Sequence, residues 1–216
     1  MACHYYLYQG VFRKMDVLHL FHAGGFMMYP LLLCSIIVVT IFIERFHFYH
    51  ANRSNIEKLT KEIPELLAAN DQEGLKAALK ADGGIPAGII LAGAEQLSSK
   101  ANQTAILEGA ASHAAGVLKS YLNYLDVIVT LSPLMGLLGT VIGMIGSFNV
   151  LSVEEGQPFA ITGGVAEALV CTASGLFVAI IALIAYTYLS QQVSNFVSQM
   201  EKLGSLYLAI VEADQK

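Results

Sequence analysis

The sequence predicts an all-α integral membrane protein with three transmembrane helices, and two observations support this prediction. Of the 216 residues, 13% are charged and 55% are hydrophobic, whereas about a quarter of the residues of an ordinary soluble domain are charged. The charges also leave three long gaps, each at least as long as the ~20 residues that cross a bilayer as a helix. No segment shows the strict alternation of apolar and polar residues typical of a half-buried strand, so no sheet is expected.

The three gaps set the order of the predicted segments. The first gap, residues 24–43, is longer than the ~7 to 15 apolar residues of a secretory signal and has no small-residue cleavage site after it, which favours a span. The second gap covers residues 127–153, and the third covers 156–200 with one charge, Glu167. The predicted segments are an N-terminal arm (1–23), a first span (24–46), a helical loop (47–126), a second span (127–150), a turn (151–159), a third span (160–189) and a helical tail (190–216).

The distribution of basic residues predicts the orientation. Eight of the twelve Lys and Arg residues lie in the loop between the first two spans, and the turn between the last two has Glu154 and Glu155 but no basic residue. Because short cytoplasmic segments carry the excess of Lys and Arg, the loop and the C-terminal tail are expected inside the cell. The arm and the turn are then external. Arg13 and Lys14 in the arm favour the opposite orientation, but the eight basic residues of the loop outnumber them.

Apolar residues at helical spacing predict that the second and third spans continue into the cytoplasm as long helices. No Pro or Gly pair separates the upstream stripe from the second span, so one continuous helix is expected from about Gln103 to about Val150. The upstream stripe is Ile106, Ala110, Ala114, Val117, Tyr121 and Tyr124, and the stripe after the third span is Val193, Phe196, Val197, Met200, Leu203, Tyr207 and Ile210.

Shorter helices are expected between residues 53 and 100. Ser54 and Glu57 have the spacing of a capping box, and Asp71 is a suitable N-cap for the next helix. Gly83-Gly84 followed by Pro86 predicts a break and a proline in a first turn.

Small residues follow one face of the second span. Gly136, Gly139, Gly143 and Gly146 are three or four residues apart, which places them on one side of a helix. Small residues let helices approach closely in lipid, so the face can serve packing within the chain, or it can meet a neighbouring subunit or a pore. Thr140 and Ser147 lie at its edge. The hydroxyl of Thr140 can bond a carbonyl one turn back or line a water path.

The third span has a similar stripe and one acid. Thr172 and Thr140 both lie about 17 Å from the external turn, so the two hydroxyls are expected near the bilayer midplane. Glu167 lies ~10 Å deep. A charge at the centre of a bilayer costs at least ~2.5 kcal/mol, so such residues usually mark an ion path; the alternative is a protonated or snorkelling carboxyl. The stripe is Ala168, Thr172, Gly175, Ala179, Ala182 and Tyr186.

Several other functions are not expected. Glu44, His47 and His50 have metal-ligand spacing, as do His19 and His22, but the spans supply no matching ligands, so we expect no metal and no cofactor. The three cysteines form neither a disulfide scaffold nor a zinc module. An intramembrane enzyme needs a converging nucleophile and base, and the three gaps between charges hold no histidine and one acid, Glu167. A net charge of -5 without a basic tract argues against nucleic-acid binding.

Two motifs resemble those of the MotA/TolQ/ExbB proton-channel family, with ExbB proteins closest and TolQ proteins next. They are LSPLMGLLGTVIGMIGSF at 131–148 and GVAEALVCTASGLFVAIIALIAY at 164–186, and MYPLLL at 28–33 with Glu44-Arg45 resembles ExbB and TolQ in the first span. The resemblance implies a homo-pentamer in the bacterial inner membrane. Its second and third spans would line a pore that holds a dimer of a single-span ExbD-like or TolR-like partner.

In that family the proton-carrying aspartate belongs to the partner, and protons are the coupling ion. Thr140 and Thr172 match the pore hydroxyls, and Glu167 matches the acid of the third span. The resemblance implies a motor that powers transport through a TonB-like protein across the outer membrane, or envelope integrity in the TolQ role; a non-conducting scaffold is the other alternative. The residues assigned to helix packing or the pore face are Pro133, Gly136, Gly139, Gly143, Ser147, Gly175 and Ala179.

Two positions depart from the ExbB pattern. Ile181 stands where ExbB proteins have a proline, and Thr187-Tyr188 stands where Asn-Arg often follows Ala-Tyr. The channel assignment is unaffected, but the choice between the ExbB and TolQ roles is weakened. A chain without its own acid at the midplane cannot relay protons alone, which also favours a partner.

Overall fold

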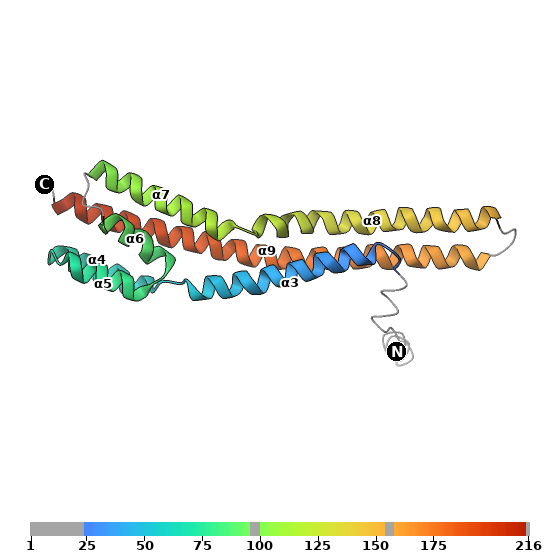
Figure 1. The fold of residues 1–216 in the computed structure, drawn as a ribbon, viewed down its shortest axis with the longest axis horizontal. Coiled ribbons are helices and arrows are strands. Elements are labelled where there is room, and N and C mark those ends of the chain that lie inside the picture. The colour runs from blue at the N-terminus through green and yellow to red at the C-terminus, as the bar shows by residue number, and fades with distance from the viewer. Residues whose placement is uncertain (1–23, 96–99, 154–157, 215–216) are drawn as a thin grey trace, which may run out of the picture. The chain divides into compact units, whose positions relative to one another are not determined.

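The computed structural model describes residues 24–95, 100–153 and 158–214, and within these ranges the protein is all-helical, as predicted (Figure 1). The predicted arm 1–23 and the centre of the predicted external turn lie outside the described residues. The helices are α3 (Met28–Ala51), α4 (Ile56–Ala68), α5 (Gln72–Asp82), α6 (Ile85–Glu95), α7 (Lys100–Lys119), α8 (Leu122–Val153) and α9 (Pro158–Asp214).

Three stretches of the described chain are long and apolar enough to cross a membrane, which confirms the three predicted apolar helices. They lie within Met28–Ala68, Gln103–Phe148 and Gly163–Val211. Large apolar side chains on these helices face outward: Leu134 is 61% and Phe177 65% exposed. Water would be a poor solvent for such faces, so they require lipid or a protein partner.

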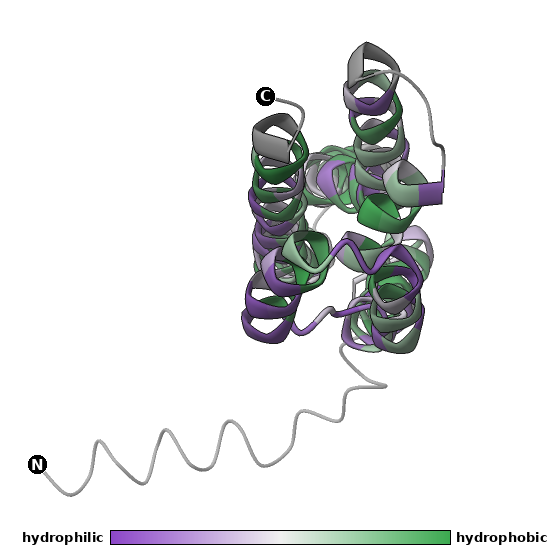
Figure 2. Ribbon diagram, turned by 90° about the vertical axis from the view of Figure 1, so that its left-hand side faces the viewer, coloured by the Kyte–Doolittle hydropathy of each residue, from purple (hydrophilic) through white to green (hydrophobic). Residues whose placement is uncertain are grey.

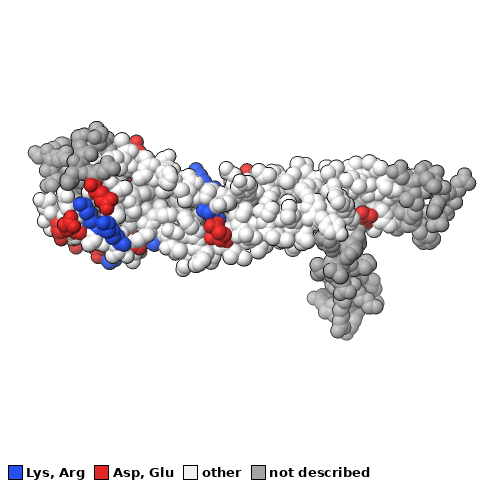
Figure 3. Space-filling view, in the orientation of Figure 1, with Lys and Arg blue, Asp and Glu red and all other residues white. Residues whose placement is uncertain are grey.

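The chain divides into two compact units. Unit 1 combines residues 1–40 with 124–185 and therefore contains the apolar parts of α3, α8 and α9. The charged residues in its described part are Asp126 and Glu167. Figure 3 shows a mostly white surface along α8 and charged side chains gathered over the region of α4 and α5.

Unit 2 combines residues 41–123 with 186–216 and holds a leucine-rich core. Leu59 and Ile63 of α4 and Leu75 and Leu79 of α5 are each at most 2% exposed. Figure 2 shows hydrophilic positions interspersed with hydrophobic ones along the helices of this unit. The predicted stripe on α9 is confirmed at its buried positions Val193, Phe196, Met200, Leu203 and Tyr207.

The caps of the short helices follow the prediction in part. Asp71 caps α5, because its carboxylate accepts from the backbone N–H of Gly74 at 2.8 Å. The Ser54–Glu57 capping box is wrong: Asn55 caps α4, accepting from Lys58 N at 3.1 Å. Ser54 instead accepts from Ala87 N at 3.2 Å and so fixes the start of α6. Gly83 ends α5 with φ 67°, a left-handed conformation that favours glycine.

The helix expected to run without interruption into the second span is broken. It ends at Lys119 as α7 and resumes at Leu122 as α8, with Tyr121 at φ 69°. The break also changes which side of the helices is buried, relative to the predicted apolar stripe. Leu118, Leu122 and Leu125 are buried, whereas Tyr124 of the predicted stripe is 62% exposed.

Candidate functional site

The predicted small-residue faces of α8 and α9 bring the two helices into backbone contact within unit 1. A Cβ added at Gly175 would lie 2.6 Å from the Ser132 carbonyl oxygen and 3.0 Å from Gly136 Cα. A Cβ at Gly136 would lie 3.2 Å from Thr172 Cα. We call this contact, formed by Gly136, Gly139 and Gly143 of α8 with Gly164, Cys171 and Gly175 of α9, the glycine crossing.

The remaining small residues divide into packed and open positions. The Cys171 thiol occupies the place where Gly139 would carry a Cβ, and Gly143 lies against the Gly164 backbone. Ser147 is 5% exposed and donates to the Gly143 carbonyl at 2.9 Å. Ala179 is 8% exposed on α9, and Pro133 is half-buried. Gly146 has nothing within 4 Å of its Cβ position. Packing within the chain therefore explains three of the four glycines, and Gly146 faces outward.

The two predicted pore hydroxyls both donate to backbone carbonyls. Thr172 Oγ1 lies 3.2 Å from the Gly136 carbonyl oxygen and 3.3 Å from that of Ala168, so it links α9 to α8. Thr140 Oγ1 lies 2.6 Å from the Leu137 carbonyl oxygen in its own helix, the local bond expected as one alternative. Thr172 thus lies within the glycine crossing, and Thr140 lies one helical turn beyond Gly136.

Glu167 lies on a different face of α9 from Thr172. Five residues separate them, which is about 140° around a helix. The half-buried Glu167 carboxylate packs against Gly25, where any Cβ would overlap Oε1. Gly25 has φ 69°, and its carbonyl accepts from Met28 N at 3.1 Å to open α3. Glu167 therefore touches the turn that starts the first span, a contact that sequence reasoning did not anticipate and that only the Gly24-Gly25 pair could have suggested.

A buried serine was also missed by the sequence reasoning. Ser132 is fully buried, and its hydroxyl has no hydrogen-bond partner among the described residues. The next residue, Pro133, has no N–H to donate back along α8. The glycine crossing therefore encloses a free hydroxyl beside a backbone that lacks one helical hydrogen bond.

A second missed set of contacts fixes the α7–α8 break in unit 2. Arg45 Nη1 donates to the Val117 carbonyl at 3.2 Å, and Tyr49 Oη donates to the Leu118 carbonyl at 2.7 Å. These carbonyls lie in the last turn of α7, where the Val117 carbonyl also accepts from Ser120 N at 3.3 Å and from Ser120 Oγ at 2.6 Å. The Arg45 guanidinium also lies 4.6 Å from the Tyr121 ring centre. We call this set the Arg45–Tyr49 clamp.

The clamp is buried, which affects the chemistry of its phenol. Tyr49 is 3% exposed, and burial raises the pKa of its hydroxyl to about 12, against a smaller opposing effect of Arg45. Its role is therefore that of a neutral hydrogen-bond donor. Among the described residues, no three His, Cys, Asp or Glu side chains converge on a position that could hold a metal ion.

Comparison with known proteins agrees with this architecture. The family model described as the MotA/TolQ/ExbB proton channel family matches residues 71–202. Two ExbB-like biopolymer transport proteins of Synechocystis sp. are 32% and 31% identical, covering 86% and 87% of this chain and 91% and 77% of their own lengths. The Tol-Pal system protein TolQ of Pseudomonas aeruginosa is 36% identical over 44% of this chain and 41% of its own. With its three apolar helices, the chain is a multi-pass inner-membrane protein that belongs to the MotA/TolQ/ExbB proton channel family.

Proposed function

We propose that the chain is the channel subunit of an inner-membrane motor that uses the proton motive force, with an ExbD-like partner, to power TonB-dependent transport across the outer membrane. One observation carries the proposal: the described part of unit 1 has a hydroxyl, Thr172, at its glycine crossing, but no acid facing it. In a family of proton channel subunits, this arrangement supplies half of a proton path.

The other half must come from a partner. Hydroxyls relay protons only through water and an ionisable group, and Glu167 lies about 140° away from Thr172 around α9. A single membrane span that carries an aspartate at the level of Thr140 and Thr172 would complete the path. Glu167, packed on Gly25, is then a second proton site or an anchor for the first span rather than part of the same contact.

The outward faces support assembly into a homo-pentamer around that partner. Leu134 and Phe177 are more than half exposed, and Gly146 leaves an open small-residue position on α8. Such faces need lipid or neighbouring subunits. A TonB-like protein is the proposed output partner. Eight of the twelve Lys and Arg residues lie in residues 44–126, which supports an external N-terminus and a cytoplasmic C-terminus.

Proton flux into vesicles tests the proposal. The chain is reconstituted with an ExbD-like single-span protein, and acidification is followed with an enclosed pH-sensitive dye. We expect flux that is lost when the partner's membrane aspartate is changed to Asn, and lost or strongly reduced in Thr172→Val and Glu167→Gln. Thr40→Val is the matched control, because Thr40 also bonds a carbonyl of its own helix, Ile36 at 2.8 Å, but lies in the first span. Flux in the aspartate variant equal to that of the unaltered complex would contradict a path through the partner's aspartate, and absence of flux from both complexes would leave only a non-conducting scaffold.

The TolQ role is the second candidate, favoured by the 36% identity to a TolQ protein. It uses the same proton path with a TolR-like partner for envelope integrity and division. Complementation separates the two: rescue of energy-dependent uptake in a strain lacking ExbB supports the first role. Rescue of detergent resistance in a strain lacking TolQ, without rescue of uptake, supports the second.

A further inference from the structure

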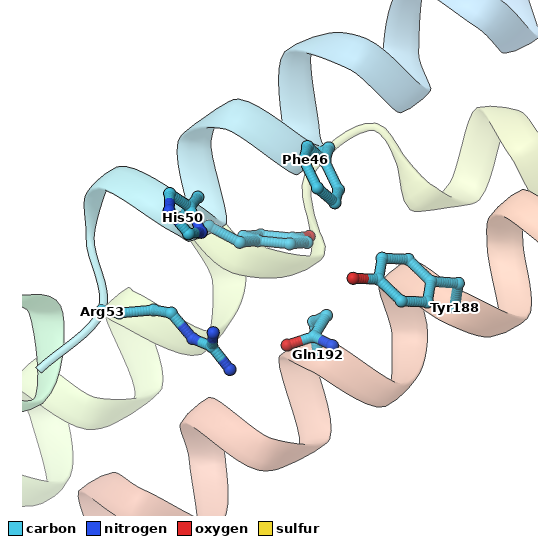
Figure 4. A pocket seen from close by; sticks show the side chains of 6 residues that line it. Phe46, His50, Arg53, Tyr188 and Gln192 are labelled. Carbon is cyan, nitrogen blue, oxygen red and sulfur yellow. The ribbon is translucent and has the colours of Figure 1, made fainter.

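A pocket of about 250 Å³ lies in unit 2, between the end of α3 and α9 (Figure 4). Phe46, Tyr49 and His50 line it from α3, Arg53 from the loop that follows, and Tyr188 and Gln192 from α9. Figure 4 shows Arg53 extending toward Gln192 beneath His50, with Phe46 and Tyr188 at the other side. No acidic side chain of the described residues lines the pocket.

The polar groups of this pocket have unused hydrogen-bonding capacity. Arg53, His50 and Gln192 form no ion pair or side-chain hydrogen bond with any residue that the structure describes. Lys58, Lys76 and Lys80 of the same unit, in contrast, each pair with a glutamate. A guanidinium, an imidazole and an amide that converge without a carboxylate favour an anion, and guanidinium geometry suits phosphate.

The opposite wall of the pocket is aromatic and leads toward the first span. Phe46 and Tyr188 stack with ring centres 6.2 Å apart, yet they are 48% and 43% exposed. Phe42, one turn earlier on α3, lies 6.0 Å from Phe46 and 6.1 Å from Tyr188. The rings of Phe42 and Phe46 thus occupy the end of the predicted span (24–46), and His50 and Arg53 follow immediately after it. This order matches the order of an acyl chain and a phosphate at a bilayer surface.

We propose that the pocket binds the phosphate head group of an anionic glycerophospholipid of the cytoplasmic leaflet. Arg53 and His50 hold the phosphate, Gln192 and the Tyr188 hydroxyl bond the glycerol or ester oxygens, and an acyl chain lies along Phe46 and Phe42. The volume is below the roughly 300–1,000 Å³ of pockets for drug-sized ligands, which fits a head group with its chains outside. The inference depends on the membrane placement of the first span but not on proton conduction.

Native mass spectrometry of the full chain in detergent micelles, titrated with phosphatidylglycerol or phosphatidylcholine, tests this assignment. We expect one tightly held phosphatidylglycerol per chain and about tenfold weaker binding in Arg53→Gln, the effect of removing one charged hydrogen bond. Gln192→Leu should weaken binding several-fold without a change of charge. Lys61→Gln is the control, because Lys61 is an exposed cation of α4 that does not line the pocket.

Three results would overturn the proposal. The first is equal affinity for phosphatidylglycerol in the wild type, Arg53→Gln and Gln192→Leu. The second is an equal loss in Lys61→Gln, which would indicate general attraction between charges. The third is displacement of the lipid by millimolar glycerol phosphate or inorganic phosphate, which would indicate a site for a soluble phosphate. Because Arg53 is exposed and bonds no described residue, its replacement should leave the helical circular dichroism spectrum unchanged, and this confirms that the variant is folded.

Discussion

The two units join their helices by different physical means. At the glycine crossing of unit 1, α8 and α9 meet backbone to backbone because side chains are missing. At the Arg45–Tyr49 clamp of unit 2, α3 and α7 meet through long polar side chains that satisfy the last carbonyls of a helix. In lipid, apolar packing between helices gains little over packing with lipid, so close approach provides the attraction. In water the leucine core already provides attraction, and the polar contacts select one geometry.

The largest effect is expected from a Gly175→Leu substitution, because the added side chain prevents the close approach of α8 and α9. The Ser132 carbonyl oxygen and Gly136 Cα lie 2.6 Å and 3.0 Å from the Cβ position and belong to backbone that cannot move aside alone. We expect a loss of about 3 kcal/mol in the free energy of unfolding, the upper end of overpacking penalties, measured by denaturation in detergent. Gly146→Leu is the matched control, with nothing within 4 Å. Equal stability of the two variants would contradict the crossing.

The second largest effect is expected when a substitution disrupts the Arg45–Tyr49 clamp. Arg45→Gln removes the bond to Val117 and the contact with the Tyr121 ring, so we expect a loss of about 2 kcal/mol in unfolding free energy. Proteolysis near Ser120–Tyr121 should also accelerate, because the break loses its support. Lys119→Gln, at an exposed position beside the break, should change stability by less than about 0.5 kcal/mol. Comparable losses in both variants would show that local charge, rather than the clamp, matters.

The clamp also explains what the sequence could not predict. Charge gaps and glycine spacing are properties of neighbouring residues, so the three spans and the small-residue face could be found from the sequence. The α7–α8 break contains neither Gly nor Pro. Its positive φ at Tyr121 is held by Arg45, which is 72 positions from its acceptor along the chain. The contact of Glu167 with Gly25 was missed for the same reason, because only the folded chain brings the two residues together.

A smaller effect is expected at high pH, which should destabilise the Arg45–Tyr49 clamp through the buried phenol of Tyr49. Burial raises the pKa of Tyr49 from 10.0 to about 12 in the folded protein, and burial also raises the pKa of Tyr207. The unfolded chain then ionises first as the pH rises. The contribution to stability is complete below pH 10 and is lost between pH 10 and about 12. Thermal unfolding in this window should show a falling midpoint that is flatter in the double variant Tyr49→Phe, Tyr207→Phe. Identical slopes would contradict the buried, neutral phenol.

The smallest expected effect compares the two threonines within unit 1. Thr172→Val removes a hydroxyl bond that links two helices, and such bonds contribute on average ~0.6 kcal/mol in a membrane protein. Thr140→Val removes only a bond to the Leu137 carbonyl of its own helix, so its stability should equal that of the wild type within error. Denaturation in detergent measures both. If both variants lose proton flux while only Thr172→Val loses stability, the hydroxyls act on protons rather than on packing. If flux follows stability, with Thr140→Val active, the role of Thr140 in the path is wrong and Thr172 serves the crossing.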